Sequence, residues 1–307
     1  MKIKSKLKIK SLGFLILSLS IFLILKKLNL LNFEILIQLI KKQPGLIIFS
    51  SLIYAISILL GSLRYKIILN SFRYKLKLKD SLRITGSSIF YGQWFPGSSA
   101  LIEFFRIFFL KKYVNIKLKE AIITAFYDKI IGLISFIIIC FFFILIKYNF
   151  YEKLIFHFFI IVLILFLINK IIVKIIKFYK TNYKTQNYFF ISAELIISLL
   201  ISTLIILSYF LISKVTGAQL SLIDIGIMMP LIAIIGILPV GLGNLGGLQV
   251  GTLLVFQFIS EKSTEIILMS LIFILITILV NSIFGIIFLK SSFSIFKQTL
   301  LNYEKKL

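Results

Sequence analysis

Residues Trp94–Gly132 read W-F-P-G-S-S-A-L-I-E-F-F-R-I-F-F-L-K-K-Y-V-N-I-K-L-K-E-A-I-I-T-A-F-Y-D-K-I-I-G, and this stretch determines how we interpret the rest of the chain. A Pro-Gly-Ser-Ser segment interrupts an apolar run, and Glu103 and Arg106 follow inside the next one. Asp128 and Lys129 then lie near the beginning of a long hydrophobic segment. Ionisable side chains are costly at membrane depth, so those that occur there usually face a bundle interior or a wet cavity. We therefore expect the functional site to include these four side chains.

The composition is that of a polytopic helical membrane protein. The chain has 307 residues, of which 60% are hydrophobic, and its mean hydropathy is +1.07. Long apolar runs separated by charged segments are typical of transmembrane helices. Because no polar stretch is long enough to form a separate soluble domain, we expect residues 1–307 to form a single integral membrane domain.

The formal net charge of +24 first suggests a nucleic-acid-binding protein. The basic residues, however, are 31 Lys and only four Arg, and most lie between apolar runs. This distribution is typical of loops that set membrane topology and attract anionic lipid, so we expect no nucleic-acid partner. The single Cys140 excludes an intrachain disulfide, and we expect a packing role for the lone His157. No catalytic residue, metal site or cofactor is expected.

Six apolar runs are predicted to span the membrane, at about 12–25, 46–69, 120–146, 154–176, 188–213 and 264–289. Two further pairs of runs are too short, because a spanning helix needs about 20 residues. These pairs, 84–95 with 99–110 and 224–238 with 246–260, predict two re-entrant broken-helix hairpins. The basic stretch 72–83 is predicted to lie at the membrane interface. The predicted fold is therefore an all-α polytopic membrane bundle with about six full spans and two hairpins.

The basic residues also predict the orientation of the chain. With the N-terminus inside, cytoplasmic segments hold 24 Lys and Arg and external segments hold eight. This bias predicts a protein of the prokaryotic cytoplasmic membrane with both termini in the cytoplasm. The first hairpin would then enter from the cytoplasm and the second from outside. Opposed broken helices of this kind build substrate sites in transporters with inverted repeats.

The spacing of the charged residues limits how they can pair. Glu103 and Arg106 are three residues apart, so they share a helix face. They could bind a charged headgroup, since Arg binds phosphate with a planar fork, or form only an internal ion pair. Asp128 and Lys129 are adjacent and point to different faces, so each needs another partner. Arg64 and Glu103 are the opposite-charge candidates, although Lys129 could instead reach the interface.

A glycine-rich loop, P-V-G-L-G-N-L-G-G at Pro239–Gly247, joins the two halves of the second hairpin. Gly241 and Gly243 permit positive φ and close backbone approach, and clustered backbone N–H groups can bind an anion. Asn244 and Gln249 are the polar side chains available there. The alternative is a tight turn that packs against neighbouring helices.

Four segments in order resemble one family. They are L-R-Y-K-I-I-L at 63–69, P-G-S-S-A-L-I-E-F-F-R at 96–106, Y-D-K-I-I-G at 127–132 and L-P-V-G-L-G-N-L-G-G-L-Q at 238–249. Together they are similar to motifs of the lysylphosphatidylglycerol synthase/flippase transmembrane family. The chain departs from that family at Leu101-Ile102, where Gly-Gly is common, and at Leu248-Gln249, where Arg-Glu is usual. The second departure removes both charges from the late hairpin.

The resemblance implies a flippase-like protein that translocates, or helps to translocate, a lipid or lipid-linked glycan during cell-envelope biogenesis. Because the soluble aminoacyl-transferase domain of some family members is missing, we do not expect synthesis of lysylphosphatidylglycerol. Two alternatives remain: a membrane enzyme acting on polyprenyl-phosphate sugars, and an accessory scaffold for a membrane glycosyltransferase. The residues expected to bind substrate are Arg64, Glu103, Arg106, Asp128, Lys129, Gly241, Gly243, Asn244 and Gln249.

Overall fold

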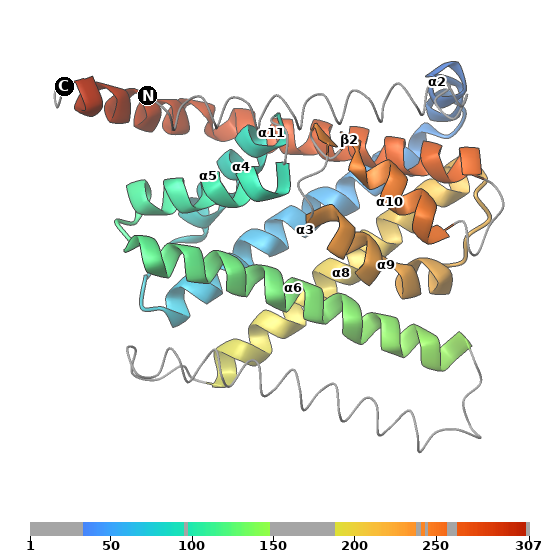
Figure 1. Ribbon diagram of the computed structural model, residues 1–307, viewed down its shortest axis with the longest axis horizontal. Coiled ribbons are helices and arrows are strands. Elements are labelled where there is room, and N and C mark those ends of the chain that lie inside the picture. The colour runs from blue at the N-terminus through green and yellow to red at the C-terminus, as the bar shows by residue number, and fades with distance from the viewer. Residues whose placement is uncertain are drawn as a thin grey trace, which may run out of the picture.

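The computed structural model is a helical bundle (Figure 1). It describes residues 33–94, 98–147, 188–237, 241–242, 245–256 and 263–304. Four of the described helices are long and apolar enough to cross a membrane, namely α3 (Pro44–Ser71), α6 (Leu118–Lys147), α8 (Tyr188–Thr216) and α11 (Ser263–Glu304). They coincide with four of the six predicted spans. The other two, 12–25 and 154–176, and also His157, lie outside the described residues.

These long helices are apolar on both their buried and their exposed faces. On α6, for example, Ile131 and Ile134 are buried while Phe126 and Phe142 are well exposed. A helix in water keeps a polar outer face, whereas a helix surrounded by lipid does not need one. The prediction of an all-α, multi-pass membrane protein is confirmed.

The first predicted hairpin consists of α4 (Leu78–Gln93) and α5 (Ser98–Tyr113), which pack against each other. Each helix has 16 residues and is therefore about 24 Å long, shorter than the roughly 30 Å apolar core of a bilayer. The two helices are so close that a Cβ atom at Gly92 would overlap both the backbone and the side chain of Ile102. Only a glycine at this position lets the two helices approach so far.

Helix α4 begins earlier than predicted. The sequence predicts an interfacial stretch up to residue 83 and an apolar piece from residue 84, but residues from Leu78 onward are helical. Asp80 in the first turn stabilises the helix N-terminus, and the polar side chains of this turn do not prevent helix formation. Before α4, the hydroxyl group of Tyr74 donates a hydrogen bond to Glu120 at the start of α6.

The second hairpin consists of α9 (Leu222–Ile237) and α10 (Gly247–Phe256). Between them β1 (Gly241–Leu242) pairs antiparallel with β2 (Leu245–Gly246). Helix α9 begins at a capping box, in which the Asp224 backbone N–H donates to the Ser221 hydroxyl group and the Ser221 backbone N–H donates to the Asp224 carboxylate. The short lengths of α9 and α10 agree with the predicted re-entrant hairpin.

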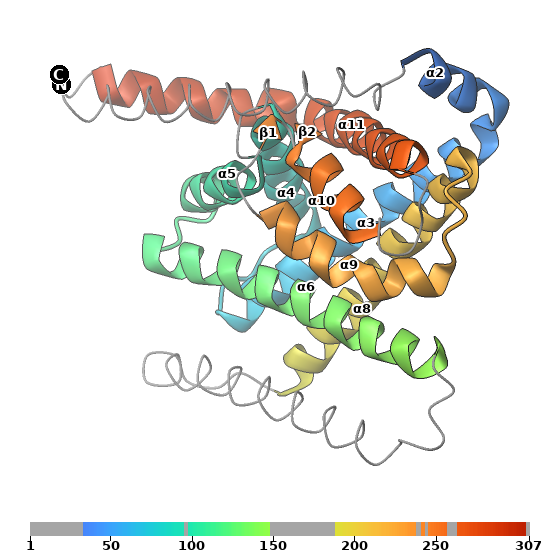
Figure 2. The same ribbon diagram turned by 45° about the vertical axis from the view of Figure 1, so that its right-hand side comes forward.

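The two hairpins enter the bundle from opposite ends. Figure 1 shows α3 ending and α6 beginning at the left, where the α4–α5 hairpin is joined to the bundle. The α9–α10 hairpin connects the right-hand ends of α8 and α11, and Figure 2 shows it beside α6 and α11. Helices α6 and α8 run in the same direction in this view. The short helix α2 (Phe33–Lys42) precedes α3 at the right-hand end.

Candidate functional site

The predicted charged residues meet in one buried network, here called the charge cluster: Arg64, Glu103, Arg106, Asp128 and Lys129. Its centre is Asp128, whose side chain is 6% exposed. The Nε atom of Arg64 lies 2.8 Å from Asp128 Oδ1, and the Nη1 atom of Arg106 lies 3.0 Å from Asp128 Oδ2. One carboxylate on α6 therefore joins a guanidinium from α3 to another from the first hairpin.

The other half of the charge cluster leads toward the surface. Arg106 Nη1 lies 3.1 Å from Glu103 Oε2, and Lys129 Nζ lies 3.1 Å from Glu103 Oε1. The Lys129 side chain is 44% exposed. Positive and negative groups thus alternate from the accessible Lys129 to the buried Arg64. The expected partners of Asp128 and Lys129 are confirmed, and so is the pairing of Glu103 with Arg106.

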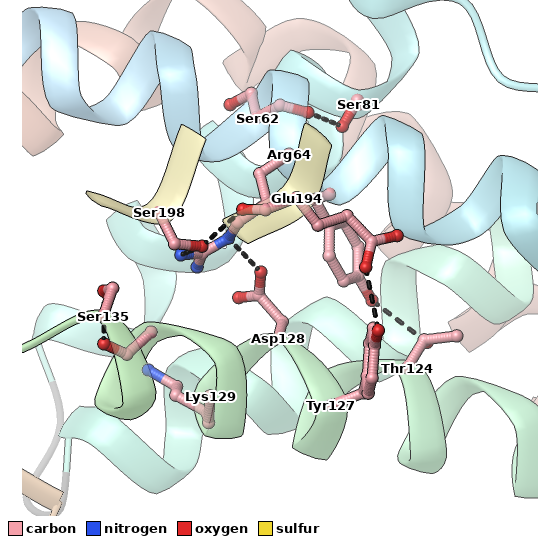
Figure 3. Close-up of polar contacts among 12 residues, drawn as sticks. Ser62, Arg64, Ser81, Thr124, Tyr127, Asp128, Lys129, Ser135, Glu194 and Ser198 are labelled. Carbon is pink, nitrogen blue, oxygen red and sulfur yellow. Dashed lines mark hydrogen bonds and ion pairs between the residues drawn. The ribbon is translucent and has the colours of Figure 1, made fainter. Parts of the chain in front are cut away.

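Local sequence explains why Arg64 can reach Asp128. Gly132 lies one helical turn after Asp128, so both face α3. A Cβ atom at Gly132 would lie 3.6 Å from the Nη1 atom of Arg64, in van der Waals contact with the guanidinium. The same Nη1 atom donates a 3.0 Å hydrogen bond to the hydroxyl group of Ser198 on α8 (Figure 3). The acid-basic-x-x-Gly segment of α6 therefore supplies the counter-ion of Arg64, and Gly132 lies beside the same guanidinium.

Arg106 has a hydrogen-bond donor that is not used within the charge cluster. It is buried, and its guanidinium stacks on the ring of Tyr65 with its central carbon 4.8 Å from the ring centroid. Its Nε atom is also buried and has no acceptor among the described residues. A buried donor without an acceptor is costly, because the full desolvation penalty is not repaid. An acceptor oxygen from a ligand would remove this cost.

Glu103 is held less firmly than Asp128. Both of its oxygens lie within ion-pair distance of a cation, but neither makes a hydrogen bond of proper geometry within the described ranges. Its attraction to Arg106 and Lys129 is therefore electrostatic only, and weaker than the hydrogen-bonded pairing of Asp128. An anionic ligand could compete with Glu103 for these two cations.

A family model described as Lysylphosphatidylglycerol synthase TM region matches residues 11–285 of this chain. The chain belongs to the lysylphosphatidylglycerol synthase transmembrane-region family. Membership confirms the family suggested by the sequence motifs and assigns the chain to the membrane proteins of lipid-related processes. No curated protein and no solved structure matches the chain.

In this family member, the structure adds a carboxylate that the sequence analysis did not single out. Glu194 lies on α8 and is fully buried. Its Oε2 atom accepts a 2.9 Å hydrogen bond from the hydroxyl group of Tyr127, the residue before Asp128 (Figure 3). A sequence signal exists, since Glu194, Ser198 and Ser202 recur every four residues within an otherwise apolar span. Such spacing places three polar groups on one helix face.

The residues of the late loop are not brought into the charge cluster by any contact between described residues. Gly241 belongs to β1 and Gln249 to α10, while Gly243 and Asn244 lie outside the described residues. The pairing of β1 with β2 agrees with a tight turn. An anion-binding role for this loop stays a prediction.

Proposed function

We propose that this family member translocates, or helps to translocate, a lipid whose headgroup contains phosphate, either a phospholipid or a lipid-linked glycan. The observation that carries the proposal is the buried Nε atom of Arg106, a donor without an acceptor in the described part of the chain. Guanidinium groups form short, charge-assisted hydrogen bonds with phosphate oxygens. The Nε atom of Arg106 is therefore available to donate a hydrogen bond to the phosphate of such a headgroup.

The charge of the cluster supports an anionic ligand. Three cations face two carboxylates, so the five side chains carry a net charge of +1. One phosphodiester would neutralise this charge. The loosely held Glu103 is the group that a phosphate would displace from Arg106 and Lys129, because Asp128 is fixed by two hydrogen bonds.

The surroundings of the cluster support a lipid more than a water-soluble anion. Phe104 is next to Glu103 on α5, and Phe126 is one turn before Lys129 on α6; both aromatic side chains are exposed. On a membrane protein such exposed apolar residues face acyl chains. A headgroup could therefore bind Lys129 and Arg106 while its apolar chains stay in the bilayer beside α5 and α6.

We further infer that the chain lies in the cytoplasmic membrane of a prokaryote with both termini inside, as the bias of basic residues indicates. The α4–α5 hairpin would then carry Arg106 from the cytoplasmic side. This proposal makes the chain a transporter or an accessory to transport, and not an enzyme.

The test is lipid scrambling by the purified protein in phosphatidylcholine vesicles. The probe is phosphatidylglycerol with a fluorophore on one acyl chain, whose outward exposure is measured by dithionite quenching. Arg106→Lys keeps the charge but loses the Nε donor. Because a hydrogen bond to a charged group contributes about 1.5–3 kcal/mol, we expect transport to slow at least about tenfold.

The matched control is Arg83→Lys on α4. Arg83 is partly exposed and lies 3.7 Å from Asp80, outside the charge cluster. Its Nε atom also has no acceptor among the described residues, so this variant controls for the loss of such a donor elsewhere in the protein. We expect this variant to transport at the wild-type rate. Equal transport by Arg106→Lys and the wild type would contradict the proposal. No transport by any variant, together with a co-purifying glycosyltransferase, would favour the accessory role.

A further inference from the structure

Glu194 is a buried carboxyl group without a counter-ion in the part of the chain that the structure describes. Its exposed fraction is 0%. The Tyr127 hydroxyl group donates to Oε2 at 2.9 Å, whereas Oε1 has no hydrogen-bond partner among the described residues. No Lys or Arg nitrogen of those residues lies within ion-pair distance of either oxygen. Figure 3 shows the Glu194 carboxyl group pointing toward the hydroxyl group of Tyr127.

Asp128 shows what an ionised carboxylate requires at this depth. It is about as buried as Glu194, but two guanidiniums donate hydrogen bonds to it. Burying a carboxylate without such compensation costs several kcal/mol or more, and a group in that position usually becomes neutral by binding a proton. A protonated Glu194 would also have an O–H donor, which could serve an acceptor from a ligand or water.

We propose that Glu194 is a proton-binding site linked to the anion site at Arg106 and Lys129 in the charge cluster. The proton comes from water and returns to water, and no covalent bond other than the carboxyl O–H forms or breaks. The linkage to an anion rests on the proposed function, whereas the proton site itself does not.

The linkage follows from the groups that surround Glu194. Those that act on it electrostatically are Arg64 on α3 and Tyr127 and Asp128 on α6. None of these groups lies on α2, α9 or α11, the other described helices that pack against α8. Arg64 thus faces both Asp128 and Glu194, so the charge of Glu194 changes the field at the same guanidinium that stabilises the charge cluster.

The sign of the linkage is fixed by counting charges. With Glu194 protonated, the charge cluster and Glu194 together carry +1; with Glu194 ionised they carry zero. An anion therefore binds better when Glu194 holds its proton. Because linkage is reciprocal, the bound anion must also favour protonation of Glu194 by the same factor. A transporter with this property moves an anionic headgroup together with a proton.

The proton site is tested by infrared difference spectroscopy on the full-length protein in phosphatidylcholine vesicles, titrated from about pH 5 to about pH 9, a range that covers buried carboxylic acids. We expect a carboxylic-acid C=O band at neutral pH that shifts in D₂O and is absent in Glu194→Gln. The control is Glu120→Gln, since Glu120 is also buried and also accepts a hydrogen bond from a tyrosine. This variant should keep the band. A wild type without the band, or a band that survives in Glu194→Gln, overturns the proton site.

The linkage is tested by binding of short-chain phosphatidylglycerol to the same proteins in detergent. We expect the wild-type Kd to increase about five- to tenfold as pH rises through the titration of the band, within the usual range of coupling between sites. Glu194→Gln imitates the protonated state and should bind tightly at every pH. The linkage is overturned if the Kd of the wild type does not depend on pH. It is also overturned if the Kd of Glu194→Gln depends on pH as strongly as that of the wild type. If no variant binds the probe while the infrared band is present, the proposed function fails and the proton site stands.

Discussion

The substitution Asp128→Asn tests the centre of the charge cluster. Asparagine keeps the size of the side chain but removes its charge, and it can accept a hydrogen bond only through one oxygen. Arg64 and Arg106 lie 2.8 and 3.0 Å from the two carboxylate oxygens. Among the described residues, Arg64 would then have no ion pair and Arg106 would keep only its ion pair with Glu103. Glu103 has no hydrogen bond of proper geometry to either guanidinium among the described residues.

The expected cost follows from burial. Removing one partner of a buried ion pair costs roughly 3–5 kcal/mol, because an uncompensated charge stays in a medium of low polarity. Asp128 compensates two arginines, so we expect its loss to fall in this range. Asp80→Asn is the matched control: Asp80 lies 3.7 Å from Arg83 and its side chain is 41% exposed. Exposed pairs contribute about 0–1 kcal/mol.

The measurement is the free energy of unfolding of each purified variant in detergent with increasing SDS. Far-ultraviolet circular dichroism reports the helix content. Fluorescence of Trp94, the sole tryptophan, reports the C-terminal end of α4 in the first hairpin. Adding Arg64→Gln to Asp128→Asn should recover at least about 1 kcal/mol, because one of the two uncompensated charges is gone. If Asp128→Asn is as stable as Asp80→Asn, the reasoning about the cluster is wrong.

Three further predictions follow from the same structure. Glu103→Gln and Arg106→Leu should each reduce stability in the SDS assay, while the double variant should approach the wild type, since replacing both partners of a buried pair is often neutral; a double variant with additive losses would contradict this pairing. In intact cells that express the protein with Cys140 replaced, Lys42→Cys should react with an impermeant maleimide and Lys112→Cys should not. The reverse result would reject the predicted orientation. Burial, and a hydrogen bond to a glutamate, raise the pKa of Tyr74 to about 12. The contribution of this group to stability is present below about pH 10 and lost as pH rises through about 12, so Tyr74→Phe should flatten the alkaline loss of stability; an unchanged alkaline slope would contradict it.

Short-range geometry made part of the site predictable from the sequence. Three-residue spacing placed Glu103 and Arg106 on one helix face. Because Asp128 and Lys129 are adjacent, they point to different helix faces and must have different partners. Few residues of opposite charge lie at membrane depth, so Arg64 and Glu103 were the candidates. The structure confirms these contacts. The apolar runs likewise predicted the four long described helices, because length and hydropathy alone decide whether a helix can span a bilayer.

The parts that were not predicted depend on how distant helices cross. Glu194 was included in an apolar span without further interpretation, since its contact with Tyr127 bridges 67 positions of sequence and follows from the packing of α8 on α6. The sharing of Arg106 between Glu103 on its own helix α5 and Asp128 on α6 likewise depends on how two helices pack. The early start of α4 was missed because polar first turns resemble interfacial loops when composition alone is considered.

The central claim is that Arg106 binds the phosphate of a lipid headgroup inside the bundle. Its most direct test is electron cryomicroscopy of the full-length protein in nanodiscs that contain phosphatidylglycerol. The account predicts density for a phosphate group with one oxygen about 3 Å from Arg106 Nε and with Glu103 displaced from that guanidinium. Lipid phosphates confined to the two membrane surfaces, together with a protein acceptor on Arg106 Nε, would contradict it.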